Sequence, residues 1–102
     1  YKKKKIGYSR FNKLKKNTFS ISIVIDKKYR NKGFGKELLE LSIIKFFSNN
    51  KGKIFSYIKT KNLKSINIFK KNFFKKISKK KFFNYTKKKI QSNEFSFFVY
   101  KR

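Results

Sequence analysis

The sequence predicts a mixed α/β domain with a central mixed sheet, two helices and the element order β-β-α-β-α-β-β. Three observations favour this fold class. Several short runs alternate apolar and polar residues, as half-buried strands do, and two longer runs repeat their apolar residues at the 3.6-residue period of a helix. The chain has 102 residues, with neither an internal repeat nor a linker rich in proline, glycine and serine. We therefore assign residues 1–102 to a single domain.

The first two strands are expected at residues 6–11 and 18–25, on either side of the polar turn NKLKKN. The second is the better defined, because its apolar residues fall on one face and its other face is mostly polar. The apolar face consists of Phe19, Ile21, Ile23 and Ile25. This alternation is typical of a strand that packs against a core on one side.

The next segment has the period of an amphipathic helix. Over residues 35–49, Leu38, Leu39, Ile43 and Phe46 fall on one face, and three further apolar residues widen it. So wide a face predicts a helix packed against the sheet. The letters NNKG that follow supply the asparagine and glycine expected near a helix C-terminus.

The second half of the chain is expected to add three strands and one helix. Residues 53–58 are rich in β-formers, and Asn62 is a suitable N-cap for a helix that runs to about residue 71. Two final strands are expected at residues 81–85 and 94–100.

The chain is strongly basic, with 31 lysine and arginine residues against 4 acidic ones and a formal charge of +27. Such a charge suits a nucleic acid, an anionic membrane or a polyanionic ligand. All but three of the cations are lysine, however, and alanine, proline, tryptophan, cysteine, histidine and methionine are absent, as in a genome biased toward A/T-rich codons. We therefore interpret the charge mainly as compositional drift on a solvated surface, and expect no specific nucleic-acid partner.

Other function classes are limited by what the sequence lacks. Without cysteine and histidine there is no disulfide framework and no plausible zinc site, and we expect no metal. No apolar run is long enough to cross a membrane, and the start YKKKKIGYSRF lacks the core of a signal peptide, so we expect a cytoplasmic protein without a membrane partner. The missing initiator methionine indicates a piece of a longer chain.

The turn between the second strand and the first helix, YRNKGFG, is predicted to bind an anion. A helix that begins directly after such a turn presents unpaired backbone N–H groups and the positive end of its dipole to one point. Gly33 and Gly35 let a phosphate approach the backbone closely, and Arg30 adds a charged donor.

The spacing of the glycines excludes two common phosphate-binding loops. Lys36 is followed by glutamate where a Walker A loop needs serine or threonine, and Leu38 stands where G-x-G-x-x-G needs its third glycine. What remains is R-x-x-G-x-G, from Arg30 to Gly35, between an apolar strand and an amphipathic helix.

This turn resembles the [QR]-x-x-G-x-[GA] turn of the GNAT superfamily of acetyl-CoA-dependent N-acetyltransferases. The likeness extends through VIDKKYRNKGFGKELL and IKTKNLKSINIFKKNFF, the second of which is similar to another motif of the family, and with IGYSRF and FSFFVY it spans nearly the whole chain. It implies a partial GNAT fold, N-terminally truncated, without the family's first strand and two helices. A typical member is about half as long again.

The resemblance also implies acetyl-CoA as co-substrate, with its pyrophosphate on the turn. The preceding strand would supply backbone hydrogen bonds to the pantetheine arm and the developing oxyanion, Asn62 would reach the pantetheine or acyl region, and Phe69 would pack beside the thioester. The cofactor-binding residues that it implies are Ile23, Val24, Ile25, Arg30, Asn31, Lys32, Gly33, Phe34, Gly35, Lys36, Asn62 and Phe69.

Two departures from the family pattern leave the catalytic residues unidentified. Phe69 stands where the family usually has a tyrosine that protonates the departing thiolate, and Phe73 stands where it usually has glycine. Some members that acetylate sugar amines also carry phenylalanine at the first position, and the chain looks most like members from nucleotide-sugar pathways such as pseudaminic-acid-type biosynthesis. The acceptor implied is a primary amine of an amino sugar or nucleotide sugar, in a protein fused to or associated with a sugar-pathway enzyme.

Acceptor chemistry points in the same direction. Deprotonating an amine of pKa about 8 at pH 7 costs about 1.4 kcal/mol, against about 4.6 kcal/mol for a lysine of pKa about 10.4. A chain with four acidic side chains and no histidine has few general bases, which favours an acceptor amine that is easily deprotonated. An α-amine is also of this kind, so a protein N-acetyltransferase of the ribosomal-protein type is the first alternative.

Each of these residues also has a purely structural interpretation, without a ligand, which stays open. The glycines make a tight turn without any ligand, Asn62 serves as an N-cap alone, and Phe69 packs in the core. Tyr57 suits either a proton donor or a half-buried face. For the whole chain, the rivals are a basic nucleic-acid-binding module and an inactive GNAT-like domain.

Overall fold

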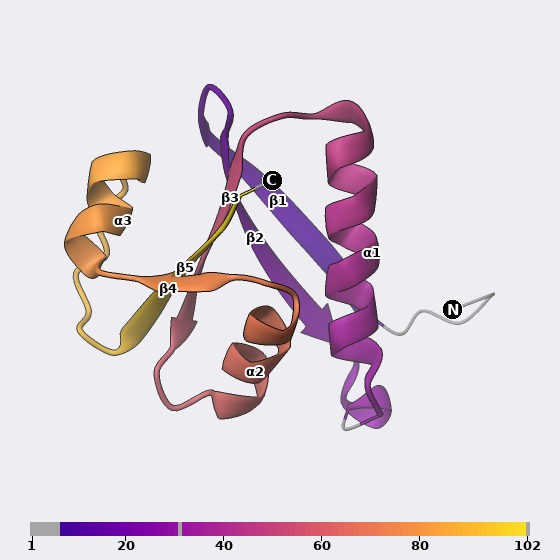
Figure 1. Ribbon diagram of the computed structural model, residues 1–102. Helices are drawn as coiled ribbons and strands as arrows, with labels where there is room; N and C mark the ends of the chain where they lie inside the picture. The colour runs from indigo at the N-terminus through magenta and orange to yellow at the C-terminus, as the bar shows by residue number, and fades with distance from the viewer. Residues whose placement is uncertain (1–6, 31, 102) are drawn as a thin grey trace.

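The computed structural model describes residues 7–30 and 32–101 as one five-stranded sheet with helices on both faces (Figure 1). The strands are β1 (Gly7–Lys15), β2 (Thr18–Ile25), β3 (Lys53–Lys59), β4 (Lys75–Ile77) and β5 (Phe95–Lys101), in the sheet order β1-β2-β3-β5-β4. The helices are α1 (Phe34–Asn49), α2 (Leu63–Lys71) and α3 (Lys79–Thr86), with a short 3-10 helix, η1 (Lys27–Tyr29), before α1. The mixed α/β class is confirmed.

The sheet opens between β2 and β3. These two parallel strands pair only from Thr18↔Lys53 to Ser20↔Phe55, whereas β2 stays paired with β1 as far as Ile25. Beyond the last pair, the hydroxyl of Ser56 donates a hydrogen bond to the carbonyl oxygen of Ile21 at 3.3 Å. We call the opening beyond this bond, between residues 21–25 and 56–59, the fork.

Two apolar clusters hold the layers together. Helices α1 and α2 pack on one face of the sheet, and α3 packs on the other, as Figure 1 shows for α1 and α3. The first cluster contains Ile21, Leu39, Ile43, Phe46, Ile54, Ile58, Phe69, Phe74 and Phe98. The second contains Phe55, Phe82, Phe97 and Val99. Strand β3 contributes to both because its side chains alternate between the two faces.

The predicted strand at residues 81–85 is wrong. These residues lie in α3, which Ser78 caps by accepting a hydrogen bond from the backbone N–H of Lys81 at 3.1 Å. Phe82 and Tyr85, one helical turn apart, both stack against Phe55 of β3. In so short a run, alternation and helical spacing place apolar residues almost equally well, so packing on β3 decides the conformation.

The strand that replaces it, β4, was not expected. It is three residues long, it pairs with β5 at the sheet edge, and its two lysines give it no apolar alternation. Strand β1 is longer than predicted, because residues 12–15 continue the pairing with β2. The part of the first predicted strand at Ile6 lies outside the described residues.

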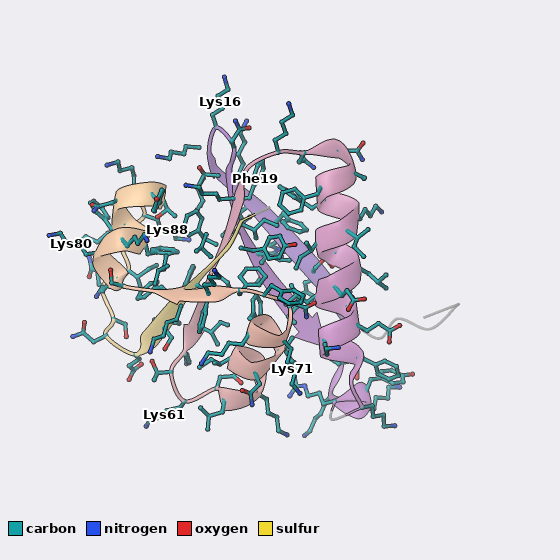
Figure 2. The ribbon with its side chains drawn as sticks, viewed as in Figure 1. Lys16, Phe19, Lys61, Lys71, Lys80 and Lys88 are labelled. Carbon is teal, nitrogen blue, oxygen red and sulfur yellow. The ribbon has the colours of Figure 1, made fainter. Side chains whose placement is uncertain are left out.

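Three labelled lysines project outward from the molecule and are exposed: Lys16 in the turn between β1 and β2, Lys61 in the turn between β3 and α2, and Lys80 in α3 (Figure 2). No helix among residues 7–30 and 32–101 is both long and apolar enough to cross a membrane.

Candidate functional site

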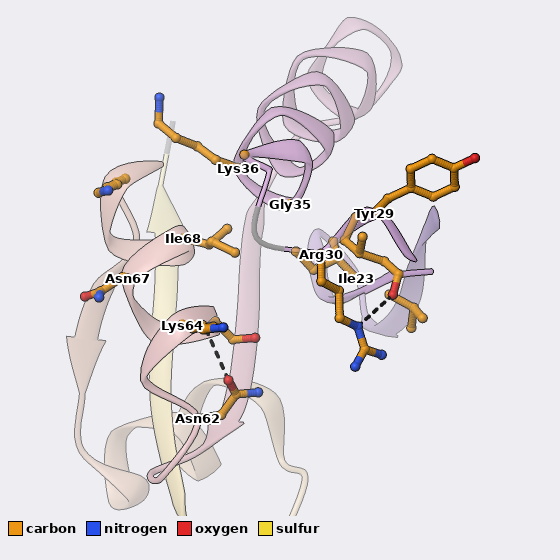
Figure 3. Close-up of a pocket in the computed structure, with 14 residues that line it drawn as sticks. Ile23, Tyr29, Arg30, Gly35, Lys36, Asn62, Lys64, Asn67 and Ile68 are labelled. Carbon is orange, nitrogen blue, oxygen red and sulfur yellow. Dashed lines mark hydrogen bonds between the residues drawn. The ribbon is translucent and has the colours of Figure 1, made fainter. Parts of the chain in front are cut away.

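A cavity of about 700 Å³ lies where the fork, the N-terminus of α1 and one side of α2 meet (Figure 3). From β2 and the turn, its lining residues are Ile23, Val24, Ile25, Tyr29, Arg30, Gly33, Gly35 and Lys36. From α2 and its N-cap, they are Asn62, Lys64, Ser65, Asn67, Ile68 and Lys71. The cavity therefore joins segments about forty residues apart in the sequence, which the crossover through α1 and β3 brings together.

The N-terminus of α1 opens into this cavity without a side-chain cap. Its N-cap is Gly33, in the left-handed conformation at φ +81°, and no side chain bonds to the first-turn amides from that position. The first intrahelical bond runs from the N–H of Glu37 to the carbonyl of Gly33 at 3.3 Å. A Cβ placed on Gly33 would meet no atom within 4 Å, so the space in front of the helix end is open. A sixteen-residue helix that begins without a side-chain cap attracts an anion to its N-terminus.

Gly35 has a different role from Gly33. It is buried, and a Cβ placed on it would come within 2.8 Å of the Cδ1 atom of Ile68 on α2. Glycine at this position lets the first turn of α1 lie close to α2. The two glycines of the motif thus serve two needs, backbone conformation at Gly33 and close helix contact at Gly35.

Arg30 is held beside the turn by the strand that precedes it. Its Nε donates a hydrogen bond to the carbonyl oxygen of Ile25 at 3.1 Å, which fixes the guanidinium at the end of β2 (Figure 3). Asp26, the nearest carboxylate in sequence, accepts a hydrogen bond from the N–H of Lys28 at 3.2 Å and does not line the cavity. It therefore caps η1.

Helix α2 begins with a side-chain cap. The Oδ1 atom of Asn62 accepts a hydrogen bond from the backbone N–H of Ser65 at 3.2 Å (Figure 3). At the other end, Asn72 is 5% exposed, and its Nδ2 donates to the carbonyl oxygens of Ile68 at 3.1 Å and Lys36 at 3.2 Å. The second of these bonds ties the first turn of α1 to the end of α2, so the two helices that line the cavity are fixed relative to each other.

The cavity is cationic. Arg30, Lys36, Lys64 and Lys71 line it, and no acidic residue is among its described lining residues. Within the described part of the chain, no group of three or more histidine, cysteine, aspartate or glutamate side chains is placed to hold a metal. The charge and the uncapped helix end together suit a ligand that carries phosphate groups.

Most of the residues implied by the family resemblance line the cavity: Ile23, Val24, Ile25, Arg30, Gly33, Gly35, Lys36 and Asn62. Lys32 lies in the turn and Phe34 is the first residue of α1, but neither lines the cavity, and Asn31 lies outside the described residues. Phe69 also does not line the cavity: the ring is 2% exposed and packs edge-to-face against Phe74, with 4.9 Å between the ring centroids. The structure thus places Phe69 in the core.

The sequence interpretation missed six lining residues: Tyr29, Lys64, Ser65, Asn67, Ile68 and Lys71. Five of them lie on α2, on one side of the helix. One sequence signal could have identified them, namely the expected core position of Phe69. In a helix that buries Phe69, Lys64 and Ile68 lie on a different side, which is the side that faces the cavity. Tyr57, the other aromatic candidate, does not line the cavity, and its hydroxyl accepts a hydrogen bond from Lys88 at 3.1 Å.

Comparison with known proteins agrees with this arrangement. The sequence model of the acetyltransferase (GNAT) family matches residues 1–73, more than two thirds of the chain. A search of curated protein sequences gives no significant match.

Solved structures with a similar fold include three from different bacteria. A GNAT-family acetyltransferase from Bacillus anthracis aligns with a TM-score of 0.73 at 20% identity, covering 93% of this chain and 57% of its own. The N-acetyltransferase PseH of Campylobacter jejuni, in complex with acetyl coenzyme A, gives 0.71 at 17%, covering 95% and 60%. The ribosomal-protein-alanine N-acetyltransferase of Brucella melitensis gives 0.75 at 14%, covering 95% and 62%. At these identities the likeness concerns the fold, and the chain spans about three fifths of each structure.

Proposed function

Because the chain belongs to the acetyltransferase (GNAT) family, we propose that its cavity binds acetyl-CoA and that the protein transfers the acetyl group to a primary amine. The observation that carries this proposal is the end of α1: an uncapped helix N-terminus with open space before Gly33, in a cationic cavity. A diphosphate suits this position because it accepts several hydrogen bonds and brings negative charge to the positive end of the helix dipole.

Two parts of the chain would hold the two parts of this ligand. The first-turn amides of α1 and the guanidinium of Arg30 would bind the diphosphate. Beyond Ser20, the edge of β2 has no pairing with β3. Its free backbone N–H and C=O groups would form hydrogen bonds with the amide groups of the pantetheine arm, which would lie along β2 like an added strand. Residues Ile23, Val24 and Ile25 line the cavity along this edge.

In the transfer itself, the nitrogen of the neutral acceptor amine forms an amide bond with the acetyl carbon and gives up one proton, the carbon–sulfur bond of the thioester breaks, and the sulfur takes up one proton and leaves as the thiol of CoA. The chain would act mainly by holding the two reactants together. Phe69 supplies no proton, since it has no hydroxyl and lies in the core. We assign no catalytic acid or base.

For the acceptor we propose an amino sugar or nucleotide sugar. This choice is supported by the sequence resemblance and by the small number of basic catalytic groups that the chain offers. We expect the protein to be fused to or associated with a sugar-pathway enzyme. A protein α-amine is the second candidate. It is favoured by the similar fold of the ribosomal-protein-alanine N-acetyltransferase, and its pKa of about 8 fits the same chemical argument.

Calorimetry with acetyl-CoA at moderately high salt tests the binding. We expect saturable one-to-one binding that weakens less steeply with salt concentration than RNA binding does, because backbone amides and pantetheine contacts add to the charged contacts. Single-stranded RNA is the comparison ligand: binding that is confined to RNA and falls steeply with salt would make the chain a basic nucleic-acid module instead.

Release of free CoA thiol tests the transfer. The chain contains no cysteine, so every thiol detected comes from CoA. Nucleotide-linked amino sugars, free amino sugars and peptides with a free α-amine are compared as acceptors at equal concentration. Turnover with the sugars alone supports the first acceptor class and turnover with the peptides alone supports the second. Binding without turnover on any acceptor would indicate an inactive GNAT-like domain.

A further inference from the structure

We propose that Lys36 and Lys71 form a second anion-binding pair at the junction of α1 and α2, and that this pair binds the 3′-phosphate of the CoA nucleotide. The inference rests on the proposed function and adds a specificity to it: the cavity would prefer CoA to dephospho-CoA. We call these two residues the lysine pair.

The lysine pair comes from two helices that a buried side chain holds together. Asn72 directly follows Lys71, and its Nδ2 donates a hydrogen bond to the carbonyl oxygen of Lys36 at 3.2 Å. The two lysines therefore start from neighbouring points of the backbone. Lys71 lies on the side of α2 toward α1 (Figure 2), and Lys36 extends from the first turn of α1 toward the C-terminal end of α2 (Figure 3). Both line the cavity.

Nothing in the described part of the chain neutralises this pair. Neither ammonium group has a hydrogen bond or ion pair among residues 7–30 and 32–101, and no described lining residue of the cavity is acidic. Two like charges held at one junction repel each other, and an anion between them removes that repulsion. Compositional drift accounts for lysines spread over a solvated surface, but it does not require two of them at the edge of one cavity.

The lysine pair is distinct from the diphosphate position. The latter lies at Gly33 and Arg30, before the first turn of α1, whereas the side chain of Lys36 extends from that turn toward the end of α2, where Lys71 lies (Figure 3). A ligand for both positions needs two separate anionic groups. The CoA nucleotide has these, a 5′-diphosphate and a 3′-phosphomonoester, and the monoester carries close to two negative charges at neutral pH.

The test compares CoA with dephospho-CoA, which lacks only the 3′-phosphate, by calorimetry at one fixed ionic strength. We expect the wild-type chain to bind dephospho-CoA about tenfold more weakly. In the double variant Lys36→Gln/Lys71→Gln, the affinity for CoA should fall to about that for dephospho-CoA, and the preference should shrink to about twofold or less.

Lys70→Gln is the matched control. Lys70 and Lys71 both lie in the last turn of α2, where each favours the helix dipole, but Lys70 does not line the cavity. Lys70→Gln should keep the tenfold preference, and Lys71→Gln alone should lose most of it. Equal binding of the two nucleotides by the wild-type chain would overturn the lysine pair and leave the proposed function standing. An unchanged preference in the double variant would overturn it as well, and failure of both nucleotides to bind would overturn the proposed function together with it.

Discussion

The helices α1 and α2 both begin at the same cavity, and they treat their first-turn amides differently. Helix α2 begins with Asn62, whose side chain accepts a hydrogen bond from the N–H of Ser65 at 3.2 Å. Helix α1 begins with Gly33, which has no side chain and leaves its first turn without a cap. The short helix α3 also has a side-chain cap, from Ser78. Among the helices of the described residues, α1 alone begins without a side-chain cap, and its amides are the ones that we assign to the ligand.

This difference between the two helix ends reflects a choice between helix stability and ligand binding. A side-chain cap contributes about 1 kcal/mol to the stability of a helix. Omitting it from α1 gives up that contribution and keeps several N–H donors available for an external anion. Substitutions at the two helix ends should therefore move stability and affinity independently, which the following variants test.

The largest effect is expected from an added carboxylate at the end of α1. Gly33→Asp should lower the affinity for acetyl-CoA by at least about 30-fold, which corresponds to about 2 kcal/mol of repulsion between the carboxylate and the diphosphate. The same variant should modestly lower the melting temperature, because a residue with a Cβ is strained at φ +81° and the left-handed backbone does not aim its side chain as an N-cap does. Calorimetry and thermal unfolding measure the two effects.

Gly33→Asn is the control for that variant. Asparagine has the same shape and a similar backbone strain at positive φ, but it has no charge. It should retain affinity within about fivefold of the wild-type chain. Equal affinities of the aspartate and asparagine variants would show that no anion lies at the end of α1.

The next effect concerns the tie between the two helices. Asn72→Leu removes the amide that bonds to the carbonyl oxygens of Lys36 and Ile68, and should reduce the free energy of unfolding by about 1–3 kcal/mol. It should also weaken acetyl-CoA binding, because the first turn of α1 is no longer fixed against α2. Denaturant unfolding and calorimetry are the measurements.

Asn50→Leu is the matched control for Asn72→Leu. The Nδ2 of Asn50 donates to the carbonyl oxygen of Phe46 at 2.9 Å, within its own helix and at the far end of α1 from the cavity. We expect a smaller loss of stability and no change in affinity. A loss of affinity in Asn50→Leu as large as in Asn72→Leu would mean that binding responds to overall stability and not to the tie.

A smaller effect is expected at the capped end of α2. Asn62→Ala should cost about 1 kcal/mol of stability through loss of the cap, with little change in affinity. Asn62→Asp keeps the cap and should keep the stability, but it places a negative charge on the cavity lining and should weaken acetyl-CoA binding severalfold. If Asn62→Ala weakens binding more than Asn62→Asp does, the amide of Asn62 contacts the ligand directly.

The contrast between the two helix ends was only partly accessible from the sequence. The strand, the turn and α1 follow from local signals, namely the alternation over residues 18–25, the two glycines and the helical period after Gly35. The cap at Asn62 is local as well. That α2 lines the cavity with Lys64, Ile68 and Lys71 is not a local property, because it depends on how Phe69 packs in the core.

The region after α2 shows more clearly that non-local packing cannot be predicted from local sequence signals. Residues 81–85 were expected to form a strand and form part of α3, because Phe82 and Tyr85 find a partner in Phe55, more than twenty residues earlier in the chain. Strand β4 exists because β5 offers it an edge, not because of its own sequence. Short segments without a strong period take their conformation from what they pack against.

The smallest effect is expected at the other end of α2, where the chain departs from the family pattern. Phe73 adopts φ +69° and is 78% exposed, and the N–H of the next residue, Phe74, bonds to the carbonyl of Phe69 as in a helix that ends on a left-handed residue. Left-handed geometry costs a residue with a Cβ about 1–2 kcal/mol, and glycine loses about 0.5–1 kcal/mol more backbone entropy than alanine on folding. Phe73→Gly should therefore raise the free energy of unfolding by about 0.5 kcal/mol and leave acetyl-CoA affinity unchanged.

Denaturant unfolding measures this gain, and Lys87→Gly is the control. Lys87 adopts φ +59° as the C-cap of α3, on the opposite face of the sheet, and it carries no exposed aromatic ring. If left-handed strain is the cause, both glycine variants gain stability by similar amounts. If Phe73→Gly loses stability while Lys87→Gly gains it, the ring of Phe73 contributes packing that outweighs its strain, and phenylalanine at this position is a structural substitute for the glycine usual in the family.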